Sequence, residues 1–180
     1  MTKLVQNSGQ IVDLLNPDPD TIKVRDIAHN LARINRFNGA TNFPYSVAQH
    51  SIYVSHIVPK EFAFVGLLHD APEAYLGDIV SPLKQLLPEY RKLEDNMWAV
   101  MARIFDIPFS IPREVHIADM RAYKKERITL IDSPMSGDPD SQVFVDLEEP
   151  ERELERGRCP ANVEAKFINR YMDLLRERIV

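Results

Sequence analysis

The stretch that decides the fold is FVGLLHDAPEAYLGDI, which runs from Phe64 to Ile79. Its apolar beginning ends abruptly in a His–Asp pair, His69–Asp70, and two more acids follow at Glu73 and Asp78. Burying ionisable groups at the end of a core helix is costly unless they have partners. The sequence therefore predicts that some other group in the fold stabilises this cluster of charges.

Pro72 divides this stretch into two helices. Proline inside a helix removes a backbone hydrogen bond and clashes with the preceding turn, whereas the first position of a helix accepts it. We expect one helix over Glu61–Asp70 and a short one over Pro72–Leu76, ended by Gly77. Neighbouring helix residues point about 100° apart, so the His–Asp pair can face one ion only at such a break.

The rest of the chain is typical of a helical domain. The segment KLVQNSGQIVDLL predicts a small N-terminal β-hairpin with its turn at Asn7–Gly9. Ile27, Leu31 and Ile34 have the spacing of one helix face, and Ser81 precedes Pro82 as an expected N-cap. The fold class is therefore all-α with a minor hairpin. Further helices are expected at 45–57, 89–105, 112–131 and 162–178, with a loop at 132–142.

Length and composition indicate one domain over residues 1–180, with its core at about 21–131 and a loop and closing helix in 132–180. The net charge of −5 argues against a basic surface for a nucleic-acid polymer. One cysteine, Cys159, excludes an intrachain disulfide. No segment has the length of a membrane span and no signal peptide is recognisable, so we expect a cytoplasmic protein, bacterial or phage-encoded.

Two residues outside the opening stretch are candidates to join the His–Asp pair. His50 shares a helix face with Val47 and Val54 and should point inward, although a lone inward histidine is more often a satisfied core residue than a ligand. Asp119 lies on the face marked by Val115, and a carboxylate there requires a partner. His116 points away from that face and is interpreted as a surface residue or as one that supports the ligands.

Two imidazoles and two carboxylates form a mixed nitrogen and oxygen donor set. Such a set suits Zn, Co, Mn or Fe better than Ca. A cation among them answers the question raised by the opening stretch, because it neutralises charges that otherwise lie uncompensated at the edge of the core.

At this point the sequence resembles the HD-domain metal-dependent phosphohydrolases. LLHDAPEAYLGDIVSPLK resembles the His–Asp–x–x–Glu–x–x–x–Gly–Asp segment of their deoxynucleotide 5′-nucleotidase branch, and AHNLARINRF resembles its N-terminal segment. VAQHS matches the first histidine, with Gln49 where glutamate is common. The chain also resembles small phage HD proteins that hydrolyse dATP. The likeness spans about Ile27 to Glu126 and implies an HD-domain helical bundle.

The resemblance implies a role for each matching residue. His50, His69, Asp70 and Asp119 would hold a divalent ion, with Co, Mn, Zn and Mg as the candidates. Glu73 and Asp78 would act as general acid or base. Four residues would contact the deoxynucleotide. Arg36 would bind the phosphate, Lys84 would reach a phosphate oxygen, and Pro82 would lie against the base edge. Phe37 would pack on the sugar and base, at a position where tryptophan is more frequent in the family.

Simpler structural roles compete with several of these assignments. Glu73 has the place of a first-turn acid favoured by the helix dipole, and Arg36 that of a solvated cation near a helix end. Asp78 after Gly77 is compatible with an ordinary turn, and Lys84 with a surface lysine. His29 could contact the substrate phosphate, but packing or a supporting role competes with that. Arg121 or Lys124 could also bind phosphate, but the basic run from Arg121 to Arg127 is compatible with a solvated face.

The resulting hypothesis is an enzyme that hydrolyses deoxynucleotides at the α-phosphate. The specific expectation is a dATP or dNTP triphosphohydrolase of the phage type, with a 5′-nucleotidase acting on monophosphates as the alternative. A cyclic-nucleotide phosphodiesterase is a weaker third possibility. The hypothesis from another class is a non-catalytic HD module that binds metal or nucleotide. Related proteins are oligomers, so a homo-dimer or larger assembly is expected, with no membrane partner.

Overall fold

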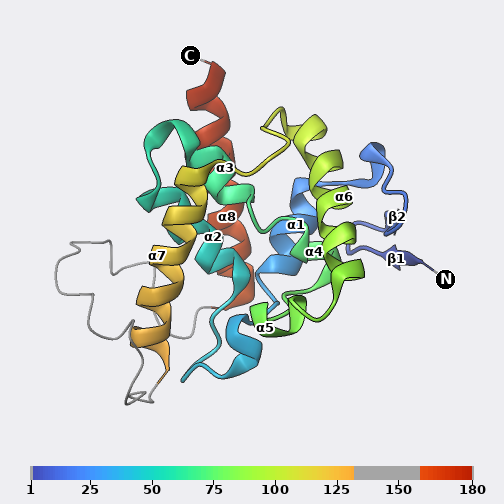
Figure 1. The fold of residues 1–180 in the computed structure, drawn as a ribbon. Helices are drawn as coiled ribbons and strands as arrows, with labels where there is room; N and C mark the ends of the chain where they lie inside the picture. The colour runs from blue at the N-terminus through green and yellow to red at the C-terminus, as the bar shows by residue number, and fades with distance from the viewer. Residues whose placement is uncertain (1, 132–158, 180) are drawn as a thin grey trace.

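The computed structural model describes residues 2–131 and 159–179 and has a mostly helical fold with a small N-terminal sheet (Figure 1). The predicted all-α class with an N-terminal hairpin is confirmed at that level. The elements are β1 Lys3–Val5, β2 Ile11–Asp13, α1 Val24–Leu31, α2 Val47–Ile57, α3 Ala63–Leu68, α4 Glu73–Leu76, α5 Ser81–Lys84, α6 Pro88–Phe105, α7 Arg113–Leu130 and α8 Pro160–Ile179.

The hairpin is antiparallel, with Lys3 opposite Asp13 and Val5 opposite Ile11. Its turn needs Gly9, whose φ of +84° lies in the left-handed region that costs other residues energy. In Figure 1 the hairpin lies beyond α6, on the side of the molecule opposite α7. It is therefore separate from the helices that carry the predicted site.

Helix α2 occupies the centre of the fold and packs against α3, α7 and α8 (Figure 1). Its residues from Val47 to Ser55 are all buried, because apolar and small side chains occur on every side of this helix. The start is fixed by a capping box, in which Ser46 accepts from the backbone N–H of Gln49 and the Gln49 side chain accepts from that of Ser46. The central position buries the polar side chains of α2 from Gln49 to Ser55, including His50, while His56 near its end is exposed.

The predicted break around Pro72 is present. Helix α3 ends at Leu68, and α4 begins at Glu73 and is ended by Gly77, with a φ of +82°. One turn joins the two helices, since the N–H of Ala71 donates to the carbonyl oxygen of Leu68 at 2.8 Å. The break presents the His–Asp pair at the edge of the buried interior.

Two sequence predictions of local structure are wrong in detail. Ile34 is not part of the first helix, because α1 ends at Leu31 and Ile34 instead accepts from the N–H of Val47 at the start of α2. Ser81 is the first residue of α5 and makes no side-chain cap, while Val80 takes the capping position. Both errors shift a boundary without changing the order of elements.

The predicted loop at 132–142 lies outside the described residues. Met97, Trp98 and Met101 of α6 are buried in the core, as their spacing indicates. No helix in the described part of the chain is both long and apolar enough to cross a membrane.

Candidate metal centre

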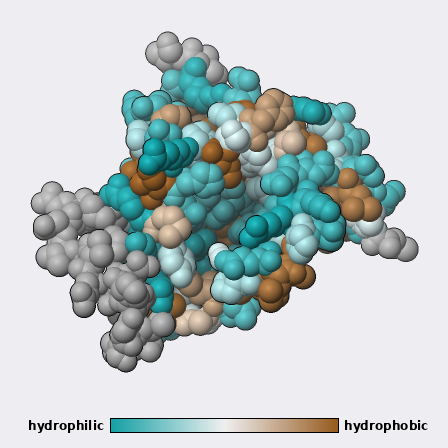
Figure 2. Space-filling view, in the orientation of Figure 1, coloured by the Kyte–Doolittle hydropathy of each residue, from teal (hydrophilic) through white to brown (hydrophobic). Residues whose placement is uncertain are grey.

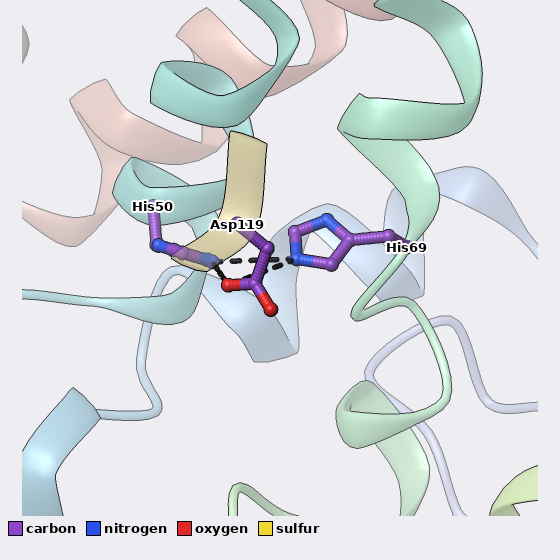
Figure 3. Close-up of side chains that lie close together, drawn as sticks. All are labelled: His50, His69 and Asp119. Carbon is purple, nitrogen blue, oxygen red and sulfur yellow. Dashed lines mark hydrogen bonds and ion pairs between the residues drawn. The ribbon is translucent and has the colours of Figure 1, made fainter. Parts of the chain in front are cut away.

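Three side chains from three helices meet beside the break (Figure 3). His50 projects from the middle of α2 and is fully buried, His69 follows the end of α3, and Asp119 comes from α7. Donor atoms from these three residues lie within 4.8 Å of one another. The fold thus brings together residues far apart in the sequence as a group that could hold a metal ion.

The distances between donor atoms are uniform and short. The two Nε2 atoms of His50 and His69 lie 3.3 Å apart. Asp119 Oδ1 lies 3.1 Å from Nε2 of His50 and 3.9 Å from Nε2 of His69. Asp70 adds a fourth donor, since its Oδ2 lies 3.3 Å from Nε2 of His69 and 3.6 Å from Nε2 of His50.

Both histidines direct the same ring nitrogen at this group. Nδ1–H of His50 donates to the carboxylate of Glu126 at 2.7 Å, and Nδ1–H of His69 donates to the carbonyl oxygen of Gly66 at 2.8 Å. Because Nδ1 carries the proton in each hydrogen bond, Nε2 of each neutral ring is unprotonated. The Nε2 lone pairs of His50 and His69 therefore point toward each other. Fixing of the ligand tautomer through the other ring nitrogen is usual at metal centres.

The donor set fits a divalent transition ion. Ligands at about 2.1 Å from a tetrahedral ion lie roughly 3.4 Å from one another, which is close to the distances measured here. Two facing imidazole lone pairs and two nearby carboxylates are mutually unfavourable without a positive charge among them. The observed geometry groups His50, His69 and Asp119 as residues that could hold a metal ion, while the role of Asp70 as a fourth ligand and the identity of the ion stay predictions.

The electrostatics of the group also favour a positive charge. Burial and the nearby Arg36 lower the pKa of His50, but Glu126 and Asp119 outweigh them and raise it to about 10. Burial raises the pKa of Asp119, yet the two histidines outweigh it and hold that pKa well below its usual range. In the metal-free protein, protons supply the positive charge that a cation would otherwise supply.

A fully buried carboxylate, Glu126 of α7, lies behind the centre. Its Oε1 accepts from Nδ1 of His50 and from the hydroxyl of Tyr45 at 2.9 Å. Its Oε2 accepts from Nε of Arg36 at 3.1 Å. Glu126 was not predicted from the sequence, although it lies on the helix face of Ala122, four residues earlier, and of Asp119, seven residues earlier.

Arg36 lies between this buried carboxylate and the centre. Besides its bond to Glu126, its Nη1 lies 3.5 Å from Oδ2 of Asp70. The segment that carries it is held against the start of α2, because the N–H of Arg36 donates to the carbonyl oxygen of Tyr45 at 2.9 Å. Arg36 therefore has a mostly buried, ion-paired side chain and is not the solvated cation considered from the sequence.

Two pockets open on either side of the centre, and Asp70, Glu73, Lys84 and Asp119 line both. The first, of about 430 Å³, lies toward α5 and is also lined by Arg36, Phe37, Asp78, Pro82 and Tyr123. The second, of about 470 Å³, lies toward α6 and includes Glu94, Trp98, Phe109 and His116. Figure 2 shows a hollowed, mostly hydrophilic surface between α7 and the α5–α6 side.

All four predicted substrate-contact residues line the α5 pocket. Phe37 adopts a left-handed backbone, with a φ of 55°, and stacks on Tyr123 with 5.7 Å between ring centroids. Such backbone conformations in non-glycine residues occur at functional sites. Tyr123 was not predicted, and its position four residues after Asp119 on α7 explains how it reaches the same pocket.

Glu73, which is buried, and Lys84, which is partly exposed, form an ion pair where the two pockets meet. Nζ of Lys84 lies 2.9 Å from Oε1 of Glu73 and 2.7 Å from Oε1 of Glu94. The second oxygen of Glu73, Oε2, is buried without a hydrogen-bond partner. Burial, followed by Asp70 and Asp78, raises the pKa of Glu73, against the opposing effect of Lys84. Lys84 is therefore ion-paired with two carboxylates, those of Glu73 and Glu94, unlike an ordinary surface lysine.

Metal binding should raise the thermal stability of the protein. An ion at about 100 times its Kd adds about 2.7 kcal/mol to the stability of the folded state. For a chain of this size that corresponds to a rise in Tm of roughly 5–10 °C. Circular dichroism can follow thermal unfolding with Mn²⁺, Co²⁺ or Zn²⁺ and then with excess EDTA, and the difference in Tm measures the stabilisation by the ion. Equal Tm values with each ion and with EDTA would contradict a metal centre.

Comparison with known proteins gives two relatives and no matching family model. The chain is 33% identical to an uncharacterized protein of Rhodobacter capsulatus over 184 aligned positions, which cover 94% of this chain and 93% of that protein. It is 44% identical to the uncharacterized protein YfdR of Escherichia coli over 108 residues, which cover 60% of this chain and 61% of YfdR. The chain therefore spans less than two thirds of YfdR.

Proposed function

We propose that this chain, which belongs to the same protein family as the uncharacterized Rhodobacter protein, is an HD-domain phosphohydrolase that cleaves deoxynucleotides at the α-phosphate. The observation that carries the proposal is the meeting of His50, His69, Asp70 and Asp119 beside two pockets that share Glu73. A structural metal would need only its ligands. A buried, partly unpaired carboxylate beside those ligands is typical of a site that moves protons.

The metal would be held by His50, His69, Asp70 and Asp119. When bound, such an ion lowers the pKa of a water molecule and polarises a phosphoryl oxygen. The remaining steps belong to the side chains around it. Oε2 of Glu73 is free to accept a proton from the attacking water, since only Oε1 is bonded to Lys84. Asp78 lines the same pocket and is the second candidate for proton transfer.

Arg36 is suited to bind the phosphate. Its planar guanidinium matches phosphate geometry, and the bond from Nε to Glu126 fixes the plane of that group. The stacked pair of Phe37 and Tyr123 provides an aromatic wall in the α5 pocket, against which a nucleoside base can pack. The pocket volume of about 430 Å³ lies in the ordinary range for small-molecule sites.

The charges around the pockets favour a monophosphate over a triphosphate. Among the described residues that line the two pockets, the arginine is Arg36 and the lysine is Lys84. Both are already paired with carboxylates. Six acidic residues line the same two pockets: Asp70, Glu73, Asp78, Glu94, Asp95 and Asp119. This excess of negative charge repels a dianionic monophosphate less than it repels a triphosphate. The 5′-nucleotidase reaction is therefore preferred to the triphosphohydrolase reaction that the sequence favours.

Product analysis with a nucleotide panel tests the proposal. Purified protein is incubated with Mn²⁺, Co²⁺, Zn²⁺ or Mg²⁺ and with deoxynucleoside mono- and triphosphates, ribonucleotides and cyclic nucleotides. We expect inorganic phosphate and deoxynucleoside from the monophosphates. Release of tripolyphosphate from a dNTP would instead assign the triphosphohydrolase reaction. Tight metal binding without turnover of any nucleotide would contradict catalysis and favour the non-catalytic module.

A further inference from the structure

The carboxylate of Glu126 connects two parts of the site that have different tasks. It touches a proposed metal ligand, His50, through Oε1 and the proposed phosphate-binding residue, Arg36, through Oε2. A third donor, the hydroxyl of Tyr45, holds Oε1 from another side. Glu126 and His50 are fully buried, so solvent cannot replace these bonds.

The carboxylate form suits this arrangement because every partner is a donor. Nδ1–H of His50, the Tyr45 hydroxyl and Nε–H of Arg36 all require acceptors, and a carboxylate accepts at both oxygens. Three donors directed at one buried side chain therefore fit the carboxylate form of Glu126.

We propose that Glu126 is a positioning residue that fixes the metal-binding nitrogen of His50 and the guanidinium plane of Arg36 through one shared carboxylate. The half that concerns His50 needs only the metal centre, while the half that concerns Arg36 rests on the proposed function. Metal binding and phosphate binding then depend on the same buried group. Its position explains how helix α7 is held against the turn at Arg36 and helix α2, since Glu126 is 90 residues from Arg36 and 76 from His50 in the chain.

An amide at position 126 cannot serve both partners. In Glu126→Gln, the amide NH₂ faces either Nε–H of Arg36 or Nδ1 of His50. The first orientation sets two donors against each other. The second moves the imidazole proton to Nε2 and blocks the nitrogen that faces the other ligands. The substitution keeps the volume of the side chain, so the loss is one of hydrogen-bond direction and charge.

The experiment compares Glu126→Gln with the wild type by calorimetric titration of Mn²⁺ alone, and then of inorganic phosphate into the Mn²⁺-loaded protein. Supporting residues of this kind change metal affinity by about 10–100-fold, so we expect the Kd for Mn²⁺ to rise by that factor. We also expect a higher Kd for phosphate and a higher KM at saturating Mn²⁺. Glu114→Gln, an exposed residue of the same helix, is the matched control and should match the wild type in all three.

Tyr45→Phe provides a second variant that preserves the charge of Glu126 and removes one of its anchors. It should retain the fold and raise the Kd for Mn²⁺ less than Glu126→Gln does. Imidazole ¹⁵N NMR of the protein loaded with diamagnetic Zn²⁺ gives a readout that a packing defect would not move, because it reports which nitrogen of the neutral His50 ring carries the proton. If Glu126→Gln does not fold, Tyr45→Phe decides the question.

The Mn²⁺ and NMR measurements need no turnover, so they separate this inference from the proposed function. Unchanged Mn²⁺ affinity in every folded variant, with the wild-type His50 tautomer, would overturn the positioning role even if the enzyme is active. A weakened Kd for Mn²⁺ in a protein that hydrolyses no nucleotide would uphold the link to His50 and reject the proposed function alone.

Discussion

Replacing Glu73 with glutamine should lower kcat by about 10²–10⁴-fold, the usual contribution of a general acid or base, while leaving the Kd for Mn²⁺ close to that of the wild type. Glutamine has the shape of glutamate but does not accept a proton at neutral pH. The unpartnered Oε2 of Glu73 is the oxygen in position to do so. Because Glu73 is not one of the four proposed ligands and its Oε1 is bonded to Lys84, the metal should stay bound.

The raised pKa of Glu73 supports this role. Burial is the largest cause, and the negative charges of Asp70 and Asp78 act in the same direction. A carboxyl group whose pKa is moved toward neutrality exchanges protons more effectively at working pH than an exposed one. The alternative read from the sequence, a first-turn acid that complements the helix dipole, predicts only a small loss of stability, on the order of 0.3–1 kcal/mol, and no loss of kcat.

Single-turnover and steady-state assays, with Mn²⁺ at saturation, measure the effect. Glu94→Gln is the matched control, because Glu94 also binds Nζ of Lys84 and lines the α6 pocket. It should disturb Lys84 in a similar way and leave kcat near the wild-type value. A Glu73→Gln protein with wild-type kcat would show that the proton moves through another group, with Asp78 as the next candidate.

The sequence located the side chains that meet at the candidate centre better than the residues that surround and support them. His69 and Asp70 are marked by the apolar run before them and by Pro72 after them, and His50 and Asp119 by their place on apolar helix faces. These are local signals that a helix period reveals. The hairpin and the break between α3 and α4 are local in the same sense, and both were placed nearly correctly.

Glu126 and Tyr123 show where such reasoning ends. Both lie in a segment dense in lysine and arginine, and that composition favours a solvated face. Glu126 is nevertheless fully buried, because the turn carrying Arg36 and the start of α2 supply donors to it. Arg36 lies 90 residues and Tyr45 81 residues before Glu126 in the chain. Helical periodicity relates only residues a few positions apart, so it does not connect Glu126 with these donors. Helix face analysis places Glu126 inward but does not reveal its partners.

Asp119→Asn should abolish measurable metal binding and, with it, turnover. Residues that only support ligands already change affinity by about 10–100-fold, so loss of a charged ligand should raise the Kd for Mn²⁺ by at least about 100-fold. Asparagine keeps the size of the side chain and removes the negative charge that faces His50 at 3.1 Å. The Tm rise on adding Mn²⁺ should disappear in this variant.

Asp119 is the decisive ligand to remove because it joins the centre from α7, distant in sequence from the His–Asp pair. Asp95→Asn is its control: Asp95 lines the α6 pocket near the centre but is not grouped with the metal-ligand candidates. If any nearby negative charge sufficed, both variants would weaken Mn²⁺ binding alike. Loss in Asp119→Asn alone would locate the ion among His50, His69 and Asp119. Wild-type Mn²⁺ affinity in Asp119→Asn would remove α7 from the centre, and with it the argument for a shared cation.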